Sequence, residues 1–232
     1  MAAVGFGQDA SATFVSYSFS ANVTQEVRGN MLASSEESFF ALGTLISGSF
    51  TYDNEAAVVA SGPDGTIYAS LSNLTGSIDG MNFSDTNGSS LVSNNGFDLD
   101  PFDPNNPLID LLALAADGGP DTSLQGFSVV SQSTQFDLVN VRMFWLSPSG
   151  DFLDDESLPL MPAAEDAQIA RLALDFVSAN DPTLNHTVFA EPLAVTPIPL
   201  PAAVWMMLSG VGALRIVGRA STKQGRIAAS RR

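Results

Sequence analysis

Cysteine is absent from the 232-residue chain, and lysine and histidine each occur once. The lack of cysteine excludes disulfides, thiolate metal sites and cysteine nucleophiles. The single lysine is Lys223, so the rest of the chain has neither a Schiff-base nor a P-loop lysine. The single histidine is His186, whereas a catalytic zinc site without cysteine usually needs more than one histidine. The chain also lacks the Gly-x-Ser-x-Gly motif that holds the nucleophile of many serine hydrolases. We interpret His186 as structural or exposed, and we expect the protein not to be an enzyme.

Basic residues are scarce before position 198. Only Arg28, Arg142 and Arg171 stand there against all 25 acidic residues, which gives this part of the chain a net charge of −22. Phosphate backbones and anionic lipid repel such a surface. Nucleic acid is therefore excluded as a partner of the body.

The chain has one long uncharged apolar run, residues 198–214. As a helix it spans roughly 25 Å, and with residues 216–218 it reaches the thickness of a hydrocarbon core, so we expect a transmembrane helix at about 200–218. A buried core helix is the alternative. The run is followed by basic residues without an acid, which predicts a cytoplasmic tail and an external body. These topology-setting residues are Arg215, Arg219, Lys223, Arg226, Arg231 and Arg232.

A proline motif, a short apolar segment and a basic end occur here in that order. The motif is Ile198-Pro199-Leu200-Pro201-Ala202, and with the rest of residues 195–232 it resembles the PEP-CTERM sorting signal of Gram-negative bacteria in its Val-Pro-Leu-Pro-Ala variant. The resemblance implies export, retention in the inner membrane, recognition by an exosortase-type transpeptidase, and delivery to the cell surface or extracellular matrix. The tail after Arg215 is longer and less uniformly basic than is usual for this signal.

The first twelve residues lack the basic and apolar regions of a signal peptide. They end in Ala10-Ser11-Ala12, however, which has the small-x-small form of a cleavage site. We interpret residues 1–12 as the remnant of a longer leader, and an ordinary amino terminus is the alternative.

Residues 13–194 have the pattern of a β-rich domain. Hydrophobic and polar residues alternate over 15–23, and further strands are predicted at 44–52, 66–75, 76–83, 126–132, 135–145 and 187–195. Asp79-Gly80 predicts a tight hairpin turn, whereas residues 84–96 and 101–107 are rich in turn formers. Residues 164–177 fit a helix or a strand, and the surrounding strands favour a strand. We therefore predict an all-β fold, a β-sandwich or jelly roll, similar to the β-rich ectodomains of PEP-CTERM proteins.

Carboxylates are the only abundant reactive groups. Asp98, Asp100 and Asp103 lie in one turn-rich loop and are candidate Ca²⁺ ligands, although solvated acidic loops are the alternative. The sequence predicts no other cofactor. We expect an exported surface or matrix protein, non-enzymatic and associated with exopolysaccharide in a biofilm. A calcium-dependent or carbohydrate-binding adhesion module and a secreted glycoside hydrolase are the alternatives.

Overall fold

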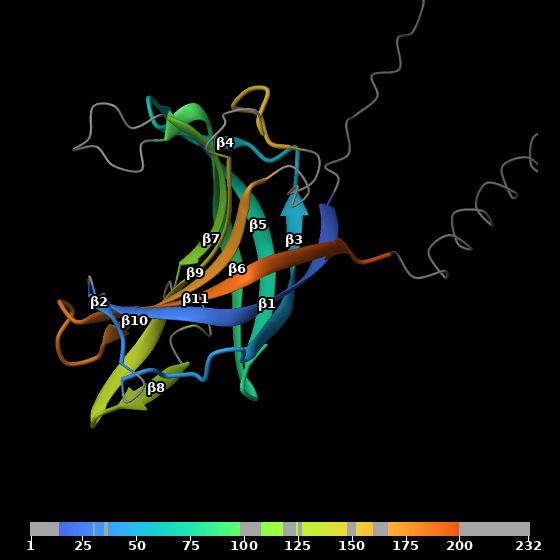
Figure 1. Cartoon of the computed structure of the whole chain (residues 1–232). Helices are drawn as coiled ribbons and strands as arrows, with labels where there is room; N and C mark the ends of the chain where they lie inside the picture. Colours follow the sequence, from blue (N-terminus) through green and yellow to red (C-terminus); the bar gives the residue numbers. More distant parts are fainter. Residues whose placement is uncertain are drawn as a thin grey trace, which may run out of the picture. The chain divides into compact units, whose positions relative to one another are not determined.

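The computed structural model describes residues 14–29, 31–34, 37–97, 108–117, 124, 127–147, 152–159 and 167–199. The chain divides into two units, Met1–Pro197 and Ile198–Arg232. In the described part of the first unit every regular element is a strand (Figure 1). These strands are β1 (Phe14–Arg28), β2 (Met31–Leu32), β3 (Leu45–Asp53), β4 (Val58–Gly62), β5 (Gly65–Ile78), β6 (Met81–Phe97), β7 (Ile109–Asp117), β8 (Ser128–Ser131), β9 (Thr134–Ser147), β10 (Ile169–Ser178) and β11 (Asn185–Pro197).

The eleven strands of the described residues form one antiparallel sheet that closes on itself. The order is β10-β11-β1-β3-β5-β6-β7-β9, and β9 also pairs with β10 along most of its length. These eight strands make a closed barrel, while β2, β4 and β8 extend it at β1, β5 and β9. Figure 1 shows the resulting strong coiling of the strands around the core.

The predicted sandwich is therefore wrong, although the prediction of an all-β fold is right. Alternation along a strand shows that one face is buried, and this is equally true of a sandwich and a barrel. The two folds are distinguished by the pairing of β9 with β10. In a sandwich the sheets have unpaired edge strands, whereas here this pairing closes the sheet into a ring. Several strands reach 13 to 17 residues, and register shifts interrupt their pairing, for example between Ser20 and Asn22 in β1. Such bulges bend long strands enough for the sheet to close.

The helix predicted at about 200–218 lies outside the described residues. Within the described part of the chain, no helix is long and apolar enough to cross a membrane. The leader remnant expected at residues 1–12 also lies outside the described residues.

Most strand predictions match the structure closely. In β1 the side chains of Tyr17, Phe19, Ala21 and Val23 point into the core, as the alternation predicts. The turn between β5 and β6 is formed by Asp79-Gly80, both with positive φ, which is the two-residue hairpin geometry that this dipeptide favours. In the ambiguous segment 164–177, residues 169–177 belong to the strand β10.

Two segments differ from the prediction. Residues 84–96 were expected to be turns, but β6 continues through them to Phe97. Its hydrogen bonds to β5 and β7 outweigh the turn preference of its asparagine, serine and glycine residues. No strand was expected at 109–117, where β7 lies. This strand is buried on both faces, so its residues show no alternation.

The barrel interior is filled by side chains. Tyr17, Phe50, Phe83, Trp145 and Phe176 are among the fully buried ones. An eight-stranded barrel is just wide enough for such side chains to fill it. The interior is thus a packed core.

One row of inward-facing positions shows how the large rings fit. Phe19, Gly48, Gly76 and Phe83 lie opposite one another on β1, β3, β5 and β6. A Cβ atom on either glycine would come closer than 3.0 Å to the neighbouring phenylalanine ring. The two glycines therefore provide the space that the two rings occupy.

Candidate functional site

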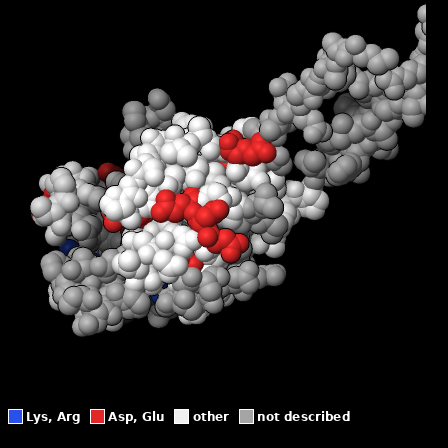
Figure 2. Space-filling view, turned by 90° about the horizontal axis from the view of Figure 1, so that it is seen from above, with Lys and Arg blue, Asp and Glu red and all other residues white. Residues whose placement is uncertain are grey.

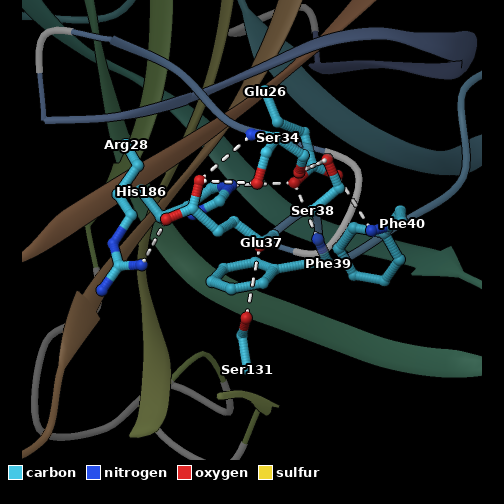
Figure 3. Close-up of polar contacts among 9 residues, drawn as sticks. All are labelled: Glu26, Arg28, Ser34, Glu37, Ser38, Phe39, Phe40, Ser131 and His186. Carbon is cyan, nitrogen blue, oxygen red and sulfur yellow. Dashed lines mark hydrogen bonds and ion pairs between the residues drawn. The ribbon is translucent and has the colours of Figure 1, made fainter.

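A buried acid–base pair lies at the end of the barrel where β1 ends and β11 begins (Figure 3). Glu26 projects inward from β1, and His186 projects inward near the start of β11. The Nε2 atom of His186 lies 2.8 Å from Oε2 of Glu26, and both side chains are only 1% exposed. A carboxylate at this depth needs hydrogen-bond donors on all sides, because water does not solvate it.

The segment Glu37–Gly43, which we call the strap, supplies two of these donors. The backbone N–H of Phe39 donates to Oε2 of Glu26 at 2.8 Å, and that of Phe40 donates to Oε1 at 2.9 Å. The ring of Phe39 stacks on the imidazole of His186 with 3.9 Å between the ring centroids. Glu26 therefore binds the strap and the histidine at once.

A second, more exposed ion pair fixes the beginning of the strap. Arg28 Nη1 lies 3.0 Å from Oε1 of Glu37, and the backbone N–H and hydroxyl of Ser34 donate to Oε2 of the same carboxylate. The hydrogen bonds from Ser34, followed by the charge of Arg28, hold the pKa of Glu37 below its usual range. From β8, the hydroxyl of Ser131 donates to the backbone carbonyl of Glu37. Figure 3 shows the contacts of Glu26 and those of Glu37 in one view.

A groove of about 630 Å³ runs beside the strap. It is lined by Thr24, Gln25 and Glu26 of β1, by Leu32 and Ala33, and by residues 38–42. Leu32 and Leu42 on its rim are more than two thirds exposed. A smaller pocket of about 330 Å³, on the side of Arg28 and Glu37, reaches Thr183–Asn185 at the start of β11. Glu26 is the only titratable side chain among those that line the larger groove.

The arrangement fits a clamp better than a catalytic pair. A general base needs an exposed nitrogen within reach of a nucleophile or a water molecule. In His186 the Nε2 atom is bound to Glu26, and Nδ1 is buried with no hydrogen-bond partner. The ring of Phe39 also covers one face of the imidazole. The pair thus joins the strap to the barrel wall.

The opposite end of the barrel has a carboxylate clamp without a histidine. Asp110 of β7 is fully buried and accepts hydrogen bonds from the backbone N–H groups of Asn95, Phe152 and Leu153, at 2.7 to 2.9 Å. The hydroxyl of Tyr52 donates to the carbonyl of Pro159. These bonds hold the loop 152–159 against this end of the barrel.

Acidic side chains gather on the end of the barrel that carries β4. Figure 2 looks onto this end and shows them across the middle of the face. Asp154 and Asp155 in the loop 152–159 are exposed. The hydroxyl and backbone N–H of Ser157 lower the pKa of Asp155, so it stays ionised at neutral pH. Among the described residues, no three metal-ligating side chains are close enough to hold an ion.

The structure places only some of the residues that the sequence singled out. The candidate calcium ligands Asp98, Asp100 and Asp103 lie outside the described residues. Of the sorting motif, Ile198 and Pro199 are described and exposed, while the remainder and the six basic residues of the tail are not described. His186 is buried and structural, which confirms one of its two interpretations.

Glu26 was not identified from the sequence. It lies three residues beyond the predicted strand 15–23, in the part of β1 that the alternation did not reach. A signal was present nonetheless, because a lone histidine in an acidic chain requires a polar partner if it is buried.

Comparisons with protein-family models, curated proteins and solved structures find no match for this chain.

Proposed function

We propose that this is a non-enzymatic protein of the cell surface or extracellular matrix, exported and sorted by its carboxy-terminal segment, residues 195–232. The observation that carries the proposal is the order of charge along the chain. A body of net charge −22 is followed by 17 uncharged, mostly apolar residues and then by six basic residues without an acid. This order favours a body outside the inner membrane and a basic end that stays in the cytoplasm.

The fold supports a role in binding or scaffolding over one in catalysis. The barrel interior is packed with side chains, so a ligand has access only to the outer surface and the ends. The buried acid–base pair is used for holding the strap. An exposed acidic surface suits a hydrated matrix, and we propose neutral exopolysaccharide as the surroundings of the mature protein.

In this proposal the proline motif is the part that the sorting enzyme reads. The apolar run retains the chain in the inner membrane, an exosortase-type transpeptidase recognises Ile198–Ala202, and the body moves on to the surface. Pro197 precedes the motif by one residue and closes β11, so it provides a matched proline outside the motif.

The test expresses the full chain behind a cleavable signal peptide in a Gram-negative host with an exosortase, and measures intact mass in the cytosolic, inner-membrane and surface fractions. We expect wild type and Pro197→Ala at the surface without the tail, and the double variant Pro199→Ala, Pro201→Ala in the inner membrane with its tail. Recovery of uncut wild-type chain from the cytosol would refute the proposal. The same would follow if the double variant were sorted like wild type.

A further inference from the structure

The outer surface of β1, β3, β5 and β6 carries rows of uncharged polar side chains. These strands are neighbours in the sheet (Figure 1). Tyr17, Phe50 and Phe83 point into the core, so the positions that alternate with them point outward. The outward positions hold only serine, threonine and asparagine, and none of them is buried. We call this surface the hydroxyl face, and its rows are Ser16-Thr51-Ser72-Asn87, Ser18-Ser49-Thr75-Ser84 and Ser20-Ser47-Ser77-Asn82.

The hydroxyl groups of the middle row are joined by hydrogen bonds. The Oγ atom of Ser49 lies 3.0 Å from Oγ1 of Thr75, and that of Ser18 lies 2.7 Å from Oγ1 of Thr196 in β11. A hydroxyl group has one donor and two acceptor lone pairs, so a bonded pair can still bind a further partner. Groups on neighbouring strands stand about 4.8 Å apart, and those along one strand about 6.7 Å. The face therefore offers regularly spaced hydrogen-bonding groups to a ligand.

An open hollow of about 400 Å³ lies within the hydroxyl face. Gly48, Gly76 and Phe83 contribute to its lining. All its other lining residues belong to the hydroxyl face, namely Ser47, Thr75, Ser77, Asn82 and Ser84. Small-molecule sites have volumes of about 300–1,000 Å³. The hollow thus has room for a sugar ring, with hydroxyl and amide groups around it.

Charge decides which kind of partner fits this surface. The body has a net charge of −22, yet every position of the hydroxyl face is uncharged. The acidic body repels an anionic polymer, and it draws a cationic one toward its carboxylates and away from this face. An apolar peptide or a lipid finds no apolar side chain in these rows to pack against. A neutral polysaccharide meets neither obstacle, and its own hydroxyl groups both donate and accept hydrogen bonds.

We propose that the hydroxyl face binds a neutral polysaccharide, with one sugar ring in the hollow and the adjoining sugars along the rows. This inference rests on the proposed exopolysaccharide surroundings and names the surface that contacts them. Each new hydrogen bond replaces one to water, so a single sugar binds weakly. Several sugars of one polymer bind together, so affinity increases with the length of the polymer.

The test titrates the full chain with dextran, pullulan and galactomannan, which are neutral, and with alginate, which is anionic, and follows the shifts of the backbone amides. We expect at least one neutral polymer to shift the amides of residues 47–49, 75–77 and 82–84, while those of β10 stay unmoved. Alginate should leave all of these amides unmoved. The proposal is wrong if no neutral polymer shifts them, or if alginate shifts them equally. Shifts that depend on protein concentration alone would assign the face to a second copy of the chain, and would also overturn it.

A pair of double variants tests the hydroxyl groups directly. Ser49→Ala with Thr75→Val removes two of them from the middle row and nearly keeps the shape of the surface. We expect binding of the neutral polymer to weaken by about tenfold. Ser128→Ala with Thr134→Val removes the same groups from β8 and β9, and should bind like wild type. Equal affinity of the two double variants would contradict the proposal, provided that circular dichroism shows both to be folded.

Binding and sorting can fail separately. If the chain is sorted and loses its tail but binds none of the neutral polymers, the role of the hydroxyl face is wrong and sorting by residues 195–232 stands. If the face binds a neutral polymer but the chain stays in the cytosol, the reverse holds.

Discussion

Replacing Gly76 with alanine adds a Cβ atom where the ring of Phe83 already lies closer than 3.0 Å to the added position. The ring must leave its rotamer or β5 must shift, and overpacking of this kind costs about 1–3 kcal/mol. The loss of backbone freedom in the unfolded chain offsets about 0.4–1 kcal/mol of that. We therefore expect a net loss of about 1–2 kcal/mol in the free energy of unfolding.

The substitution of Gly76 should also be energetically coupled to the ring of Phe83. Phe83→Ala removes the ring and should cost about 3–5 kcal/mol by itself. In that background the clash is gone, so Gly76→Ala should cost close to nothing, which gives a coupling of about 1–2 kcal/mol. Gly48 behaves differently, because its added Cβ would also meet the backbone carbonyl of Thr75, and removal of the Phe19 ring would not relieve that contact.

The assay is urea unfolding of the full chain followed by far-ultraviolet circular dichroism. Gly62→Ala on β4 is the control, since no atom lies within 4 Å of its added Cβ and its φ is ordinary. It should change stability by no more than about 0.5 kcal/mol. A clash between the added Cβ and the Phe83 ring is refuted if Gly76→Ala is as mild as this control, or if it costs the same with and without that ring.

Three further predictions concern buried and paired polar groups. Asp110→Ala removes the acceptor of three N–H groups, that of Leu153 buried and those of Asn95 and Phe152 half-buried, so it should cost about 2–3 kcal/mol and raise hydrogen exchange in the loop 152–159. Asp110→Asn should be milder, and equal exchange in both variants would contradict this. Arg142→Met removes the bidentate pair with Asp175, but Arg142 is 42% exposed, so the loss should stay below about 1 kcal/mol and shrink with added salt. Burial raises the pKa of all three tyrosines, most strongly that of Tyr52. Native protein should therefore form tyrosinate at higher pH than unfolded protein, and the free energy of unfolding should fall as the pH rises above about 10. Identical ultraviolet titrations of the native and unfolded states would refute this.

The sequence predicted the local elements well where one face of a strand meets water. Alternation located the inward residues of β1, and Asp79-Gly80 located a hairpin turn. Both signals depend only on neighbours along the chain. The strand β7 gave no such signal, because it packs on both faces and its residues between Asp110 and Asp117 are all apolar.

Neither the closure of the barrel nor the candidate site could be predicted from local sequence patterns, because both depend on contacts between distant parts of the chain. The pairing of β9 with β10 depends on how far the sheet bends, which bulges in several strands determine together. Glu26 and His186 are 160 residues apart, and their partnership depends on the register between the first and the last long strand. A single sequence contains no short-range pattern that encodes such a contact.

The neighbourhood of β1 and β11 also governs when the protein can fold. The first strand lies between β3 and the last strand, so the wall stays open until residues 185–197 are available. Such long-range pairing gives a high contact order and slow folding. An amino-terminal fragment that ends before β11, such as one still being synthesised on the ribosome, keeps one flank of β1 unpaired and its aromatic interior accessible to chaperones.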